Sequence, residues 1–69
     1  MSFNYSKLLG KMRECGYTQE KLAEDMQLNK GTLNAKLNNK SIFTAVEMDC
    51  ICKLLKIPSN EIGDYFFAI

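Results

Sequence analysis

Apolar residues recur with a helical period in three separate stretches of the chain. The first stretch predicts a helix over about residues 3–15, with Asn4 placed to cap its start. Gly16 follows directly and is a candidate left-handed stop. The apolar positions of this helix, spaced i, i+3, i+4 and i+7, are Tyr5, Leu8, Leu9 and Met12.

A second, shorter stretch predicts a helix that begins at Thr18 and ends near Met26. Thr18 is a good N-cap, and Glu20 stands where a carboxylate favours the positive end of the helix dipole. Its inward positions are Leu22, Ala23 and Met26. Gln27 and Leu28 then form a turn, with Leu28 directed to the core.

The third stretch opens with Thr44 and Glu47, which together make a complete capping box. The apolar period then continues through Met48, Ile51, Cys52 and Leu55. Pro58 ends this helix and opens a last short helical turn that runs to about Tyr65. No strand pattern and no repeat occurs, so the predicted class is all-α with five short helices.

The stretch between these helices, residues 29–40, has a different character. It holds three lysines, four asparagines and a threonine but no acid, and Leu33 and Leu37 are its only large apolar residues. On a helix capped by Asn29 and running to about Asn38, this pair makes a narrow apolar stripe and leaves the other sides polar. Amides can pair with adenine edges, and lysines suit guanine edges or phosphates. We therefore predict a recognition helix that contacts double-stranded DNA.

Length and charge are compatible with this hypothesis. Sixty-nine residues, 46% of them hydrophobic, make one small domain over residues 1–69. The net charge is only +1, but every charge between Asp25 and Glu47 is positive. A local positive field can attract a polyanion even when the total charge is near zero.

Several other function classes have little support. No apolar run is long enough for a membrane span, and no signal peptide is visible, so we expect a cytoplasmic protein of a bacterial or phage-infected cell. The odd cysteine count, Cys15, Cys50 and Cys52, favours reduced thiols in or near the core. Without histidine, a nucleophile–base pair or a phosphate-binding glycine loop, we expect no enzyme, no metal, no cofactor and no small-molecule ligand.

The segment TQEKLAEDMQLNKGTLNAKL, residues 18–37, resembles the helix-turn-helix of the Cro/C1-type (XRE) family of repressors. The later run KLNNKSIFT and the segment CKLLKIPSNEIGDYFF are similar to small phage Cro-like or repressor-like members, so the resemblance covers nearly the whole chain. It implies a lambda-repressor-like domain of five helices, with the helix-turn-helix at about residues 18–38.

The resemblance also implies which residues would contact DNA. The family's base-contacting positions fall on Lys30, Gly31, Asn34 and Ala35, and a helical wheel drawn from Leu33 independently points Gly31, Asn34, Ala35 and Asn38 outward. Gln19 would reach a phosphate and brace a recognition side chain, and Lys30 and Lys36 would flank the outward face. Beyond it, Lys40 and the backbone N–H groups of Phe43 and Thr44 would touch phosphates. The predicted DNA-binding set is Gln19, Asn29, Lys30, Gly31, Thr32, Asn34, Ala35, Lys36, Asn38, Lys40, Phe43 and Thr44.

Three positions depart from the family pattern or from helix rules. Gln27 stands where the family has a turn glycine, and a non-glycine with positive φ is strained unless the turn is rebuilt. Lys36 takes a position that is usually apolar. Gly31, in the first turn of its helix, costs about 1 kcal/mol relative to Ala and has no packing reason on the helical wheel.

The resulting hypothesis is a phage or prophage repressor that occludes a promoter as a homodimer on two operator half-sites. The apolar C-terminal tail, residues 65–69, either covers the first and fourth helices or makes the dimer contact. Two alternatives stay open. The same fold could serve as a protein-interaction module that binds another regulator, or as an antitoxin-like autoregulator.

Overall fold

The computed structural model describes residues 2–69, and in this range all regular secondary structure is helical, with no strand. This confirms the predicted all-α class. None of these helices is long and apolar enough to cross a membrane. The elements are α1 (Ser6–Glu14), α2 (Gln19–Asp25), α3 (Lys30–Leu37), α4 (Ala45–Leu55), the 3-10 turn η1 (Ser59–Glu61) and α5 (Ile62–Phe66).

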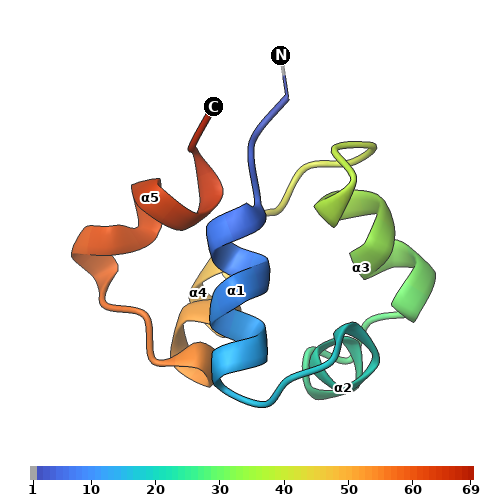
Figure 1. Ribbon diagram of the computed structural model, residues 1–69. Helices are drawn as coiled ribbons and strands as arrows, with labels where there is room; N and C mark the ends of the chain where they lie inside the picture. The colour runs from blue at the N-terminus through green and yellow to red at the C-terminus, as the bar shows by residue number, and fades with distance from the viewer. Residues whose placement is uncertain (1) are drawn as a thin grey trace.

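Helices α1 and α4 occupy the middle of the molecule, with α5 on one side and the α2–α3 pair on the other (Figure 1). The two ends of the chain lie at the same end of the fold. The backbone N–H of Asn4 donates to the carbonyl of Ala68 over 2.7 Å and joins them. The pair α2–α3 therefore lies on the side of the molecule opposite α5 (Figure 1).

Helix α1 begins later than the sequence predicts, at Ser6 instead of Phe3. The side chain of Asn4 does act at this end, because its Oδ1 accepts the backbone N–H of Ser6 over 2.9 Å. Tyr5 takes the cap position itself and turns its ring into the core. Asn4 is thus a local capping residue, as predicted, but it lies one residue outside the expected position.

The first four helices end in the same left-handed turn, although only one of the turns uses glycine. The left-handed residues are Gly16 (φ 77), Gln27 (φ 59), Asn39 (φ 63) and Lys56 (φ 57). At Gln27 the backbone N–H donates to the Glu24 carbonyl, and the next N–H reaches back to Ala23, as in a Schellman motif. The turn is therefore not rebuilt around Gln27. The strained conformation is retained at a cost of about 1–2 kcal/mol relative to glycine.

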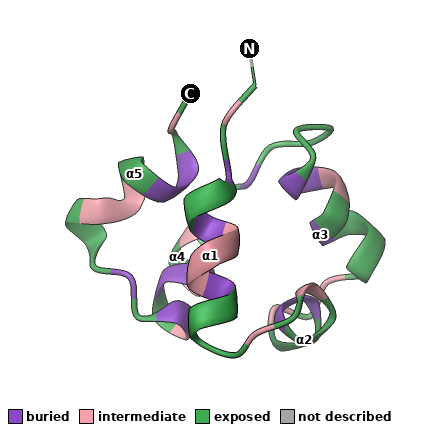
Figure 2. Ribbon diagram, viewed as in Figure 1, coloured by how far each residue is buried: buried purple, intermediate pink, exposed green. Residues whose placement is uncertain are grey.

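A single apolar core lies beneath all five helices, and purple buried segments face one another across it in Figure 2. Phe43, from the loop between α3 and α4, belongs to this core. The Phe43 ring meets the rings of Tyr5 and Phe66 edge-on, with centroids 5.6 Å and 5.4 Å away. The Phe43 side chain therefore turns inward. Leu28 is only partly buried beside this core.

The apolar tail divides between two environments. Tyr65 and Phe66 are buried, so this part of the tail belongs to the core, where α5 packs on α1 and α4. Phe67 is 50% exposed and Ile69 is 81% exposed. The structure thus confirms core packing for the first half of the tail and leaves the second half available for a contact with another molecule.

The three cysteines are free thiols in different environments. Cys52 is buried, and burial raises the pKa of its thiol. Cys50 is half-buried, whereas Cys15 is exposed and its Sγ lies 3.7 Å from the carbonyl oxygen of Leu55. The expectation that all three pack in or near the core therefore fails for Cys15, which lies at the solvent-exposed end of α1.

Candidate nucleic-acid interface

Helices α2 and α3 form a compact unit of two packed helices joined by a short turn. Both starts are capped as the sequence predicts. The Thr18 hydroxyl accepts the N–H of Lys21 over 3.1 Å, and the Asn29 side chain accepts the N–H of Gly31 over 2.7 Å. Leu22 and Ala23 of α2 and Leu33 of α3 are buried, so each helix packs on the core with one side.

The opposite side of α3 faces solvent. Leu33 and Leu37 are buried, as the narrow stripe predicts. The predicted outward positions are exposed apart from half-buried Ala35, and green exposed segments of α3 can be seen in Figure 2. The exposed residues from the predicted DNA-binding set that lie on α3 or at its ends are Asn29, Lys30, Gly31, Thr32, Asn34 and Asn38.

Three amide side chains on this face are joined into one chain of hydrogen bonds. Asn34 Nδ2 donates to Gln19 Oε1 over 3.1 Å, which links α3 to the first residue of α2. Asn38 Nδ2 donates to Asn34 Oδ1 over 2.8 Å, one turn further along α3. We call Gln19, Asn34 and Asn38 the amide ladder. It places Gln19 against Asn34, one of the residues predicted to face DNA.

Lys30 does not stand free on the exposed face. Its Nζ lies 3.7 Å from Glu20 Oε2, in the first turn of α2. Both side chains are more than half exposed, so the pair is screened by water and contributes little to stability. Its effect on the interface is larger, because the carboxylate of Glu20 offsets one of the few positive charges there.

The prediction that Lys36 flanks the outward face is wrong. Lys36 is buried, and its Nζ lies 2.9 Å from Glu47 Oε1 on α4 and 3.0 Å from the carbonyl oxygen of Ile42. Its long aliphatic stem fills a position that the Cro/C1 resemblance predicts to be apolar, and its ammonium reaches polar partners beyond the stem. Lys36 therefore fastens α3 to α4 and is not available to a nucleic acid.

Glu47 also removes a second predicted DNA contact. The backbone N–H of Thr44 donates to Glu47 Oε1 over 2.8 Å, and the N–H of Glu47 donates to Thr44 Oγ1 over 3.1 Å. This capping box is complete, as predicted, but it occupies the N–H that was expected to hold a phosphate. At Phe43 only the backbone stays a candidate, since the ring is buried.

The charge on Glu47 follows from the same contacts. Burial alone raises the pKa of its carboxyl group. The hydrogen bond from the Thr44 backbone, together with the hydrogen bond and positive charge of Lys36, outweighs that effect and leaves the pKa below its ordinary value. Glu47 is therefore ionised at neutral pH and closes the N-terminal end of α4.

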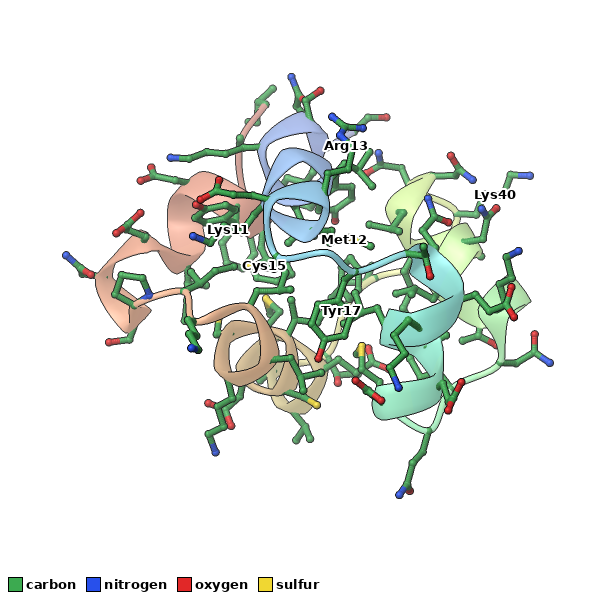
Figure 3. The ribbon with its side chains drawn as sticks, turned by 60° about the horizontal axis from the view of Figure 1, so that its bottom comes forward. Lys11, Met12, Arg13, Cys15, Tyr17 and Lys40 are labelled. Carbon is green, nitrogen blue, oxygen red and sulfur yellow. The ribbon has the colours of Figure 1, made fainter. Side chains whose placement is uncertain are left out.

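Lys40 is exposed and, within residues 2–69, makes no ion pair. Figure 3 shows it at the outer edge of the molecule, just beyond the end of α3. The preceding Asn39 is clamped: its Oδ1 accepts the N–H of Phe3 and its Nδ2 donates to the Phe3 carbonyl, each over 2.8 Å. The segment that carries Lys40 is thus held against the start of the chain.

Gly31 has a structural reason that the helical wheel does not reveal. A Cβ at this position would lie 3.1 Å from Asn29 Oδ1, the oxygen that caps α3. The cap oxygen sits directly over the first turn, so any side chain at Gly31 must crowd it. The expectation that packing gives no reason for this glycine is therefore wrong.

Sequence reasoning missed the long-range contacts of three residues that shape this surface, Glu20, Asn39 and Glu47. Glu20 pairs with Lys30 and Glu47 pairs with Lys36. The lysines that are consecutive charges in the sequence therefore do not form a continuous positive surface. Asn39 anchors the loop after α3. The capping-box pattern identified Glu47, and an asparagine directly after a helix is a typical left-handed residue, but neither pattern identifies the long-range partner.

The comparisons with known proteins add a family but no activity. No curated protein matches this chain. The family model described as "Protein of unknown function (DUF739)" matches residues 1–69, and the chain therefore belongs to the DUF739 family.

Proposed function

We propose that this protein is a sequence-specific DNA-binding regulator of the Cro/C1 type, which contacts the major groove through α3 and blocks transcription from an overlapping promoter. The observation that carries the proposal is the two-sided character of α3. This helix is anchored on the core by Leu33 and Leu37 and braced by α2, yet it turns a continuous polar face to solvent. The resemblance of residues 18–37 to the Cro/C1 family supports the same interpretation.

The predicted DNA contacts are revised by the side-chain geometry. Asn34 and Ala35 would face base edges, with Asn38 held beside Asn34 and with Lys30 and Gly31 near the end that enters the groove first. Gln19, Asn29, Thr32 and Lys40 would contact the phosphate backbone. Lys36 and the N–H of Thr44 are withdrawn, because both are already bound within the protein.

A homodimer in the cytoplasm of a bacterial or phage-infected cell is the proposed working form. One helix of eight residues contacts only a half-site, and two half-sites one helical turn apart would supply the missing affinity. Phe67 and Ile69 are candidates for the dimer contact, since large apolar side chains at this exposure are available to a partner.

The first test is a mobility-shift titration of duplex DNA that flanks the protein's own gene, at two salt concentrations. A discrete complex that resists competition by unrelated duplex is the expected result, with a stoichiometry of two chains per site. Lys40→Ala should weaken binding to all sequences alike and reduce the salt slope by about 1. Lys56→Ala is the matched control, because Lys56 is also exposed and makes no ion pair within residues 2–69 but lies at the far end of α4.

Diffuse binding that modest salt abolishes, or no binding, would contradict the proposal. One observation then favours a protein-interaction module. Two of the three lysines in residues 29–40 are paired with acids, while Ile42, Val46, Phe67 and Ile69 are exposed apolar residues. A surface of this kind suits a protein partner better than a polyanion.

A further inference from the structure

The amide ladder limits what Asn34 can bind. A free asparagine amide carries two donor hydrogens and two acceptor lone pairs, so it can serve several base edges. In this protein one N–H of Asn34 donates to Gln19 Oε1 over 3.1 Å. One lone pair of Asn34 Oδ1 accepts a hydrogen bond from Asn38 Nδ2 over 2.8 Å. One donor and one acceptor are left.

The remaining pair fits one base in the major groove. Adenine offers the acceptor N7 beside the donor N6, and an amide with one donor and one acceptor meets both. Guanine offers two acceptors, N7 and O6, and would need two donors. Cytosine and thymine present only a single donor or a single acceptor there, so they can satisfy half of the amide at most.

The ladder also couples the direction of the Asn34 amide to the directions of its two partners. If this amide alone rotated by 180°, its oxygen would face Gln19 Oε1 and its nitrogen would face Asn38 Nδ2, which turns two hydrogen bonds into two repulsive contacts. The bonds lie on an exposed surface, so they contribute little to folding. Their clearest consequence is therefore orientation of Asn34 before DNA arrives.

We infer that the amide ladder makes Asn34 an adenine-selective residue, with Gln19 and Asn38 as positioning residues that confer this selectivity without touching the base. The inference rests on the proposed function and adds the base to it. Each half-site should carry an A·T pair opposite Asn34. Half-buried Ala35, next to Asn34 on α3, is placed to contact a neighbouring thymine methyl group.

The test uses the full chain and duplexes that it selects from a random-sequence library. The position assigned to Asn34 is the one at which Asn34→Ala loses preference. Fluorescein-labelled duplexes with each of the four base pairs at that position are then titrated with the wild type, Asn34→Ala, Gln19→Ala and Asn38→Ala. The wild type should prefer adenine about tenfold, and all three variants should bind the four duplexes nearly equally.

Two controls separate positioning from general weakening. Gln19→Glu keeps an oxygen that accepts from Asn34, so it should lower affinity for every duplex through its negative charge and retain the adenine preference. Lys40→Ala should weaken binding without changing the preference. Far-UV circular dichroism and urea unfolding check that each variant is folded, which is expected because these side chains are solvent-facing or only half-buried.

The outcomes are distinct. A preference for G·C at this position, or an adenine preference that survives Gln19→Ala and Asn38→Ala, would overturn the ladder hypothesis while leaving DNA binding intact. Failure of the wild type to select or bind any duplex would overturn the proposed function and this inference with it.

Discussion

Helices α3 and α4 are neighbours in the chain with similar caps, but they use their polar groups in opposite ways. Each begins with a side chain that accepts a backbone N–H of its own first turn, Asn29 in α3 and Thr44 in α4. In α4 the acid of the first turn, Glu47, folds back to close the helix and to hold Lys36. In α3 the first turn has no acid, and its polar side chains point to solvent.

Because of this difference, we expect substitutions at the start of α4 to change stability and substitutions on the outer face of α3 to change DNA binding. The polar groups at the start of α4 are satisfied inside the protein, so changing them should affect folding. The amides of α3 bond only to one another and to Gln19 at the surface, so changing them should affect binding. Lys36 is the exception that joins the two helices, because it comes from α3 but belongs to the internal network of α4.

The largest effect is expected from Glu47→Ala. The substitution leaves the buried ammonium of Lys36 without its carboxylate and opens the cap of α4, and we expect a loss of about 3 kcal/mol in the free energy of unfolding. Urea unfolding at pH 7 measures it. Asp49→Ala is the matched control on the same helix, since its pair with Lys53 is exposed and should contribute less than about 1 kcal/mol. Equal losses for both variants would erase the contrast between internal and surface charges.

A smaller effect should appear as a dependence of stability on pH. The folded pKa of Glu47 lies below its ordinary value, so its contribution is complete above the unfolded pKa of about 4.3. It is then lost as the pH falls through the folded pKa. The wild type should therefore lose stability below about pH 4 relative to Glu47→Gln, in which the group cannot titrate. Parallel curves for the two proteins in urea midpoints from pH 6 to pH 3 would show that this carboxyl group is not coupled to folding.

Removal of the N-cap side chains of α3 and α4 should have a moderate effect on the free energy of unfolding. Thr44→Ala and Asn29→Ala should each cost about 1 kcal/mol of stability. Only Asn29→Ala should also weaken binding to the selected duplex in conditions where both variants are fully folded. Asn29→Ser retains a capping oxygen and should recover most of the stability. If Thr44→Ala weakened DNA binding as strongly as Asn29→Ala, the assignment of α4 to a purely structural role would be wrong.

Local signals in the sequence were sufficient for most of the fold. The caps at Thr18, Asn29 and Thr44 and the left-handed stop at Gly16 depend on a few adjacent residues, so each is visible in the sequence and present in the structure. The start of α1 was misplaced, because Asn4 caps Ser6 through its side chain without occupying the cap position.

The polar surface was harder to predict because its partners lie far apart in the sequence. The pairing of Lys30 with Glu20 depends on how α3 packs on α2, and the pairing of Lys36 with Glu47 depends on where α3 lies relative to the start of α4. A helical wheel gives the direction of a side chain from the axis of its own helix and carries no information about neighbouring helices. It therefore placed Asn34 and Asn38 correctly, whereas the assignment of Lys36 to the edge of the outward face was wrong, because its partner Glu47 lies on another helix.

The smallest expected effect on stability, from Gly31→Ala, decides why α3 carries a glycine in its first turn. Alanine gains about 1 kcal/mol of helix propensity, but its Cβ would lie 3.1 Å from the capping oxygen of Asn29. The two effects oppose each other, so the net change should be within about 0.5 kcal/mol. Gly10→Ala in α1 is the matched control, since no neighbouring atom lies within 4 Å of the added Cβ, and it should stabilise by the full amount. The difference between the two variants measures the crowding at the cap.

If Gly31→Ala has the stability of the wild type but binds the selected duplex less tightly, the glycine also serves close approach to DNA. Unchanged binding would limit its role to the cap of α3.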